Sequence, residues 1–395
     1  MRVATSQMNA QGLAALQRQQ AQLLRTQTQI GADTRLLRAA DDPVAAGTAS
    51  RLDAHRQRLD DQARAATFAR HRLGLEESAL AEAGDLLVRA RELTVQANSG
   101  VQSAESRRAI VVELDGVFEQ MLSLANRGDG EGGFLFGGAE TRQPPFASAG
   151  SGVRYQGGGE AARLQISDTL SVDSGDAGDQ IFTQLRSGNG QLSLSAAAGN
   201  TGTAAPSVLG PTQQAWANGP YTLSFDATGY TLRDGGGVTV TSGARDGNRV
   251  QLGDLALTFN SPPADGDQFT LAPAASQDVF ATLRQLRDLA AASPASGAER
   301  ARQQTALFDG LGALEQAETR LSEVRARVGT RLQAVDRAES EREANRVQID
   351  QTLATTRDLD LAEAATRLNR QLTAVQAAQQ SYLRIQGLSL FDRLR

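Results

Sequence analysis

Residues 39–52 read AADDPVAAGTASRL, and this stretch separates two helical patterns. Asp41 and Asp42 precede Pro43, and paired carboxylates are also the groups that general acid–base catalysis uses. A proline suits the first turn of a helix, and an aspartate just before it accepts hydrogen bonds from the unpaired N–H groups there. We therefore expect Asp42 to cap a helix that begins at Pro43, and Asp41 to anchor the preceding loop. The pair is interpreted as a joint between two helices, not as a catalytic dyad.

Apolar residues recur every seven positions on both sides of this joint and again toward the C-terminal end. A strict seven-residue repeat predicts a coiled-coil-like seam. Isolated helices are marginal in water, so we expect the N- and C-terminal helices to pair with each other. The repeats run through Leu16, Leu23 and Ile30, through Leu52, Leu59, Ala66, Leu73, Leu80 and Leu87, through Leu314, Leu321, Val328 and Val335, and through Leu361, Leu368, Val375 and Tyr382.

The outermost helices have a thin and partly polar seam, with Gln20, Gln27 and Gln379 as companions of the apolar residues. Such helices should be mobile in the monomer and become ordered against neighbouring subunits. The apolar character continues to the last residues, and exposed apolar surface usually marks a contact. The expected assembly seam comprises Leu16, Leu23, Ile30, Leu361, Leu368, Val375, Tyr382, Leu388, Leu390 and Phe391.

In the middle of the chain Gly, Ser, Thr, Asp and Asn dominate, and apolar residues alternate, as in Tyr221, Leu223 and Phe225. This alternation predicts antiparallel sheets with one buried face. The predicted fold class is α+β, an elongated coiled-coil-like helical bundle built from the N- and C-terminal segments, with an inserted antiparallel β domain. The expected domains are a terminal helical segment (1–40 and 359–395), a helical rod (41–133 and 276–358) and an inserted β-rich domain (134–275).

The composition offers few groups for chemistry. All 40 residues counted as Lys or Arg are arginines and the chain has no cysteine, which excludes lysine- and thiol-based catalysis. His55 and His71 would lie roughly 24 Å apart along one helix, too far to share a metal. The run GDGEGG at 128–133 matches G-x-G-x-x-G, but it follows a helix instead of a strand, which favours a flexible turn. We expect no catalytic, cofactor-binding or metal-binding residues.

Charge and hydropathy narrow the classes of partner. The net charge is −5, and acids and arginines are interleaved, so we expect no nucleic-acid binding. No segment approaches the ~18 apolar residues of a transmembrane helix, so we expect no membrane insertion. The start, MRVATSQMNAQGL, lacks the hydrophobic core of a signal peptide.

Several long motifs resemble the flagellin superfamily. LRAADDPVAAGTAS, followed by RHRLGLEESALAEAGDLLVRARELTVQANSG, is similar to its N-terminal helical region. The start MRVATSQM and the ending LNRQLTAVQAAQQSYLRIQGLSLFDRLR resemble one branch, the hook-associated proteins of the hook–filament junction. The stretch from AWANGPYTLSFDATGYTLRD to PPADGDQFTLAP resembles a β module of that branch. The chain departs from the family at residues 31–35, where GADTR replaces the more usual S-x-G-K-R and loses its glycine.

The resemblance implies a structural adaptor without catalysis. It implies a ring-like homo-oligomer between hook-associated protein 1 on the hook side and flagellin on the filament side, with an export chaperone as an earlier partner. In that ring the terminal segments would line an inner tube and the β domain would face outward. It also implies export through the flagellar type III channel without a cleaved signal peptide, and hence an extracellular place on the flagellum. A flagellin-type filament subunit stays open as an alternative. So does a different class, a stalked glycan-binding or enzymatic β module.

Overall fold

The computed structural model describes residues 2–99, 102–140, 142–150, 152–210, 216 and 219–391. The chain divides into two compact units, Met1–Arg64 with Ala338–Arg395, and Ala65–Arg337. In the described ranges, the helices are α1 (Arg2–Ala32), α2 (Pro43–Asn98), α3 (Ala104–Ala125), α4 (Val279–Ala291), α5 (Gly297–Arg357) and α6 (Leu361–Phe391), with a short π-helix, η1 (Asp179–Thr183). The strands are β1 (Phe146–Ala149), β2 (Gly152–Tyr155), β3 (Arg163–Gln165), β4 (Ser171–Asp173), β5 (Leu185–Arg186), β6 (Leu192–Ala196), β7 (Pro206–Leu209), β8 (Tyr221–Phe225), β9 (Gly229–Arg233), β10 (Thr239–Ala244), β11 (Arg249–Leu252), β12 (Leu255–Phe259), β13 (Gln268–Pro273) and β14 (Ser276–Gln277).

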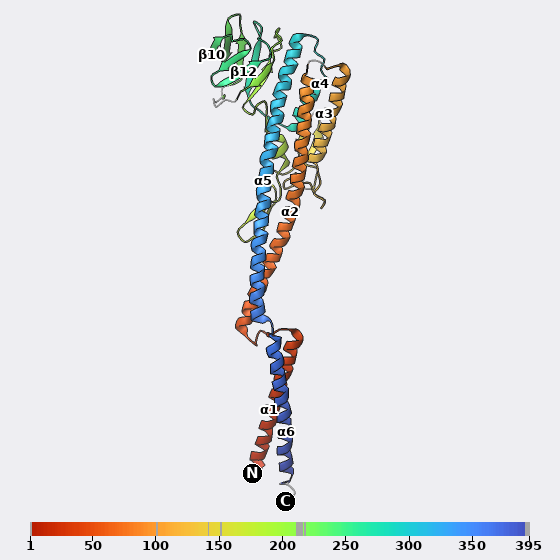
Figure 1. Ribbon diagram of the computed structural model, residues 1–395, viewed down its shortest axis with the longest axis vertical. Helices are drawn as coiled ribbons and strands as arrows, with labels where there is room; N and C mark the ends of the chain where they lie inside the picture. The colour runs from red at the N-terminus through yellow and green to blue at the C-terminus, as the bar shows by residue number, and fades with distance from the viewer. Residues whose placement is uncertain are drawn as a thin grey trace. The chain divides into compact units, whose positions relative to one another are not determined.

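In the first unit, α1 and α6 pack side by side (Figure 1). An antiparallel bridge between Thr34 and Asp358 joins the end of α1 to the start of α6, so the two helices run in opposite directions. The beginning of α2 packs against the end of α5 in the same unit. Its small buried cluster consists of Ala49, Leu59, Ile349 and Leu353.

A left-handed residue ends α1. Asp33 has a φ of 49°, a conformation that strains most side chains but that aspartate tolerates. Its N–H donates to the carbonyl of Ile30 at 3.3 Å, and the N–H of Thr34 donates to the carbonyl of Gln29 at 3.2 Å, which closes the helix end. Asp33 occupies the position of the glycine in S-x-G-K-R. The aspartate therefore supplies a backbone turn that suits glycine.

The apolar repeats of α1 and α6 lie on the sides that pack together, except for Leu361 at the start of α6. In α1 each repeat residue is partly buried, and in α6 the most buried one is Val375, at 7% exposed. Tyr382 packs beside Gly12, where an added Cβ would lie 3.4 Å from its ring. The partly buried members are Leu16, Leu23, Ile30, Leu368 and Tyr382.

The polar companions of this seam were placed wrongly by the sequence pattern. Gln20, Gln27 and Gln379 are exposed. The partner helix covers the flank three residues after each leucine instead of four, so Gln19 is partly buried and Thr26 is only 3% exposed. A seven-residue repeat predicts that the leucines are buried, but it does not tell whether the residue three positions or the one four positions after each leucine is buried with it. Either position forms a continuous apolar stripe with the leucines.

Two buried polar atoms lower the stability of the pairing between α1 and α6. Oε1 of Gln19 and Oε1 of Gln371 are buried and have no hydrogen-bond partner among the described residues. A buried acceptor without a donor costs about 1–3 kcal/mol. The expectation that these helices gain order in an assembly stays a prediction, and the two unpaired oxygens agree with it physically.

The second unit has a helical core formed by α2, α3, α4 and α5. Predicted repeat residues of α2 and α5 are fully buried in it, including Leu73, Leu80, Leu314 and Val328. Part of the region expected to belong to the β domain packs here as well. Phe136, Phe146 and Phe182 join Phe280 of α4 in this core, with ring centroids 5.3–5.6 Å apart for three of the pairs.

Two antiparallel sheets form the β module. One has the strand order β10-β9-β8-β13-β6, and the other has β11-β12-β7. Alternate residues of these strands point into a shared core, whose aromatic centre is Phe225, Phe259 and Phe269. Helical ends with an antiparallel β region between them confirm the predicted α+β class.

Candidate functional site

The predicted joint begins with a capped helix. Helix α2 starts at Pro43, and Oδ1 of Asp42 accepts a hydrogen bond from the Ala45 N–H at 3.0 Å. That backbone hydrogen bond is the main cause of a lowered pKa for the Asp42 carboxyl, and the nearby Arg35 adds to it. Arg35 Nη1 lies 3.4 Å from Asp42 Oδ2. Asp42 is therefore held in its charged form, which a general acid is not.

Asp41 is engaged on the other side of the joint. Its Oδ2 accepts hydrogen bonds from the N–H groups of Leu37 at 3.2 Å and Arg38 at 3.1 Å. Its Oδ1 pairs with Arg25 of α1 at 2.8 Å. The two adjacent carboxylates therefore have separate partners, Asp41 toward α1 and its loop and Asp42 toward the start of α2. This arrangement fixes the loop between α1 and α2 and provides no shared proton for acid–base chemistry.

The same loop is tied to the end of α5. The Arg35 N–H donates to the Arg357 carbonyl at 2.8 Å, and the Thr34 hydroxyl donates to the same carbonyl at 3.1 Å. Arg35 Nη2 donates to the Thr356 carbonyl at 2.7 Å. These carbonyls belong to the last turn of a helix and lack partners within it. Residues 33–42, which connect α1 to α2, are thus hydrogen-bonded to the connection between α5 and α6.

Variants of the joint should separate a structural role from a chemical one. Asp41→Asn and Asp42→Asn are expected to be mild, because asparagine keeps an acceptor oxygen. Asp41→Ala removes the oxygen that accepts the N–H groups of Leu37 and Arg38, together with the ion pair to Arg25, and should cost about 1–3 kcal/mol. Asp42→Ala should raise hydrogen exchange of the Ala45 amide. Thermal unfolding and a motility assay of the four variants would check this, and loss of function by the Asn variants at unchanged stability would contradict it.

Outside the α1–α6 seam, exposed leucines form a second row on each helix. On α1 they are Leu13 (46% exposed) and Leu24 (61%); on α6 they are Leu361 (52%), Leu372 (37%) and Leu383 (65%). Neighbours in each row are eleven residues apart. Leu361 was expected in the seam but faces solvent. The side chains of Leu388, Leu390 and Phe391 lie outside the described residues.

A buried ion pair that the sequence pattern missed holds the GDGEGG turn. Arg72 of α2 lies 2.6 Å from Asp129, and each side chain is 8% exposed. Arg72 also donates to the carbonyls of Ser174 and Leu135 at 3.3 and 3.2 Å. Asp129 Oδ1 accepts the N–H groups of Glu131 and Gly133 at 2.9 Å each. The turn expected to be flexible is therefore tightly bonded.

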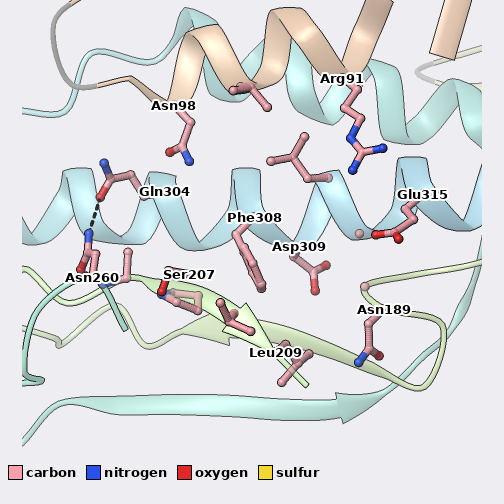
Figure 2. A pocket seen from close by; sticks show the side chains of 17 residues that line it. Arg91, Asn98, Asn189, Ser207, Leu209, Asn260, Gln304, Phe308, Asp309 and Glu315 are labelled. Atoms are coloured by element: carbon pink, nitrogen blue, oxygen red, sulfur yellow. Dashed lines mark hydrogen bonds between the residues drawn. The ribbon is translucent and has the colours of Figure 1, made fainter. Parts of the chain in front are cut away.

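A cavity of about 520 Å³ lies in the second unit between α2, α5 and the β module (Figure 2). Arg91 and Asn98 come from α2, and Phe308 and Asp309 from α5. Burial raises the pKa of the Asp309 carboxyl, which accepts the Leu194 N–H at 2.7 Å and the Ser193 hydroxyl at 2.9 Å. Asp309 thus attaches β6 to α5.

None of the helices in the described ranges has the apolar stretch that a membrane span needs. In that same part of the chain, no group of three or more His, Cys, Asp or Glu side chains could hold a metal ion.

Known proteins are similar to this chain at both ends. Residues 3–141 match the bacterial flagellin N-terminal helical region, and residues 311–392 match the bacterial flagellin C-terminal helical region. Flagellar hook-associated protein 3 of Salmonella typhimurium is 32% identical over 187 residues, which are 47% of this chain and 58% of that protein. The Escherichia coli protein of the same name is 31% identical over the same lengths. The matched part thus spans less than two thirds of these relatives.

Solved structures extend the similarity over most of the fold. The crystal structure of Xanthomonas campestris FlgL is 30% identical and has a TM-score of 0.71, covering 77% of this chain and 99% of that one. Hook-associated protein-3 of Legionella pneumophila is 23% identical with a TM-score of 0.72, covering 78% and 98%, which shows a shared fold. Because the Xanthomonas protein is matched along nearly its whole length, and flagellin helical regions match both ends, this chain belongs to the FlgL family of the flagellin superfamily.

Proposed function

We propose that the protein is a structural subunit of the bacterial flagellum that joins the hook to the filament and has no catalytic role. Its relatives are named for association with the flagellar hook. The observation that carries the proposal is the second row of leucines on α1 and α6. Five leucines that are 37–65% exposed stand outside the intramolecular seam, and a contact with neighbouring subunits would bury them.

The proposed partners follow from this role. The subunit would form a ring with copies of itself, contact hook-associated protein 1 on one side and contact flagellin on the other. Before export it would bind a flagellar export chaperone. It would leave the cell through the type III channel without a cleaved signal peptide and reside outside the cell at the hook–filament junction. Asp41 and Asp42 would serve this role by fixing the direction in which α1 and α6 leave α2 and α5.

Deletion of the gene tests the junction role. Cells without the protein should build complete hooks and release flagellin into the medium, because the filament would lack its attachment point. Swimming, electron microscopy of hooks and an immunoblot of flagellin in the medium are the measurements. If the protein were instead a filament subunit, the deletion strain would lack filaments and would release no flagellin. If it were a glycan-binding or enzymatic β module, the deletion strain would still build normal filaments. Normal filaments on the deletion strain would refute the junction role.

A further inference from the structure

One buried carboxylate of the second unit, that of Glu76, has an unusual environment. Glu76 of α2 is 2% exposed, and its Oε1 accepts the Asp176 N–H at 3.0 Å. Its Oε2 is buried with no hydrogen-bond partner among the described residues. This oxygen faces Gly175, where an added Cβ would lie 3.3 Å away. One oxygen of Glu76 is thus used to hold the backbone of residues 173–178, and the other is unused.

The arginines nearby make their hydrogen bonds and ion pairs with Asp176, and Arg331 acts on Glu76 only as a nearby charge that lowers its pKa less than burial raises it. Arg331 of α5 contacts both oxygens of Asp176, at 2.7 and 3.2 Å, and Arg327 lies 3.6 Å from it. Arg331 also lies 3.4 Å from Asp173, which Arg163 contacts from β3. The other charged pair packed here is Arg72 with Asp129, and Arg72 also donates to the Ser174 carbonyl of the same segment at 3.3 Å.

A proton explains the unused oxygen better than a metal ion does. Both oxygens of Asp176 are already bound by Arg331, so they are not free to coordinate a cation. A neutral Glu76 would instead have an O–H to donate to the neighbouring Asp176 carboxylate, and such a side-chain hydrogen bond favours the neutral form. Burial, and then the negative charge of Asp176, raise the pKa of Glu76 to about 8.

We propose that Glu76 is a proton-dependent anchor, which in its neutral form fixes residues 173–178 between α2 and α5 and releases them as the pH rises. The anchored segment connects β4 to η1, whose Phe182 enters the helical core. Release would therefore loosen the attachment of the β3–β4 hairpin to the helices. The device is independent of the junction role and acts within one subunit.

The direction follows from proton linkage. The ordinary pKa of 4.5 applies when the segment is released, and about 8 applies when it is anchored. The contribution of Glu76 to anchoring is complete below the lower value. It is lost progressively as the pH rises between the two values and is absent above the upper one. The equilibrium constant for release should increase by up to about tenfold for each pH unit in this window and then level off.

Hydrogen exchange of the purified full chain tests the anchor, with protection factors corrected for the intrinsic effect of pH. The Asp176 amide should lose more than about tenfold protection from roughly pH 5.5 to 7.5. Glu76→Gln keeps the acceptor and donates permanently, so its protection should be high and independent of pH. Glu77→Gln is the matched control, because Glu77 pairs with Arg325 on the exposed side of the helix, and it should behave as wild type.

Infrared spectroscopy gives a second reading that does not depend on the variant's stability. The wild type at about pH 7 should show the carbonyl band of a protonated carboxyl group, which ordinary Asp and Glu lack at this pH. The band should disappear above the raised pKa and be absent from Glu76→Gln. Equal pH profiles for the wild type and Glu76→Gln would overturn the proposal. So would a wild type without the band.

Discussion

Replacing Leu372 and Leu383 with aspartate is expected to abolish incorporation of the protein into flagella and swimming, while the monomer stays folded. These residues are 37% and 65% exposed, so folding gains little from them, and a surface change of this kind usually alters stability by about 0.5 kcal/mol or less. In a subunit contact each leucine would contribute about 1.5–3 kcal/mol, and a buried carboxylate would cost more. In a ring of identical subunits the two substitutions would weaken every contact between neighbours.

Swimming assays, detection of the exported protein and thermal unfolding of the monomer provide the measurements. Asn369→Asp is a matched control, because it adds one negative charge at an exposed polar position of the same helix. Leu368→Asp and Val375→Asp probe the inner seam and should loosen α1 from α6 already in the monomer. A Leu372→Asp, Leu383→Asp protein that is exported and fully supports filaments would show that the outer row is no assembly surface.

Arg72→Met should destabilise the second unit by about 3–5 kcal/mol, because removing one partner leaves the buried charge of Asp129 unpaired. It also leaves the carbonyls of Ser174 and Leu135 without their donor. Denaturant unfolding followed by circular dichroism measures the loss.

Adding Asp129→Asn to Arg72→Met should restore part of that stability. The amide oxygen of asparagine still accepts the N–H groups of Glu131 and Gly133, and the unpaired charge is gone. Arg70 forms a comparable ion pair with Asp336 at the surface, so Arg70→Met should change stability little. A loss below about 1 kcal/mol for Arg72→Met would contradict the assigned role of the pair.

The sequence predicted those features whose signals are local or periodic. Asp42 next to Pro43 is a local signal, and α2 begins at Pro43. The repeat through Leu73 and Leu80 specifies buried positions, and these residues are fully buried. Alternation around Leu223 predicts an antiparallel strand for the same reason, since one face must be covered.

Long-range polar pairs gave no such signal. Arg72 and Asp129 are 57 residues apart, and Glu76 and Asp176 are 100 residues apart. One hint was available, because Arg72 and Glu76 flank the core position of Leu73, and an inward charged residue needs a partner. Which partner it finds depends on how the loops fold back, and the repeat carries no information about that.

The two rows of apolar residues on α1 and α6 differ in the sense in which they wind. An ideal helix turns about 100° per residue, so seven residues fall about 20° short of two turns and eleven exceed three turns by about 20°. The inner row, through Leu16 and Leu23, therefore drifts around the helix in one direction, and the outer row, through Leu372 and Leu383, drifts in the other. A helix that follows the inner row must cross with a left-handed supercoil, and a helix that follows the outer row with a right-handed one. The partner within the chain and any neighbour outside it would thus wrap in opposite hands, and the twists that they impose on α6 would oppose each other.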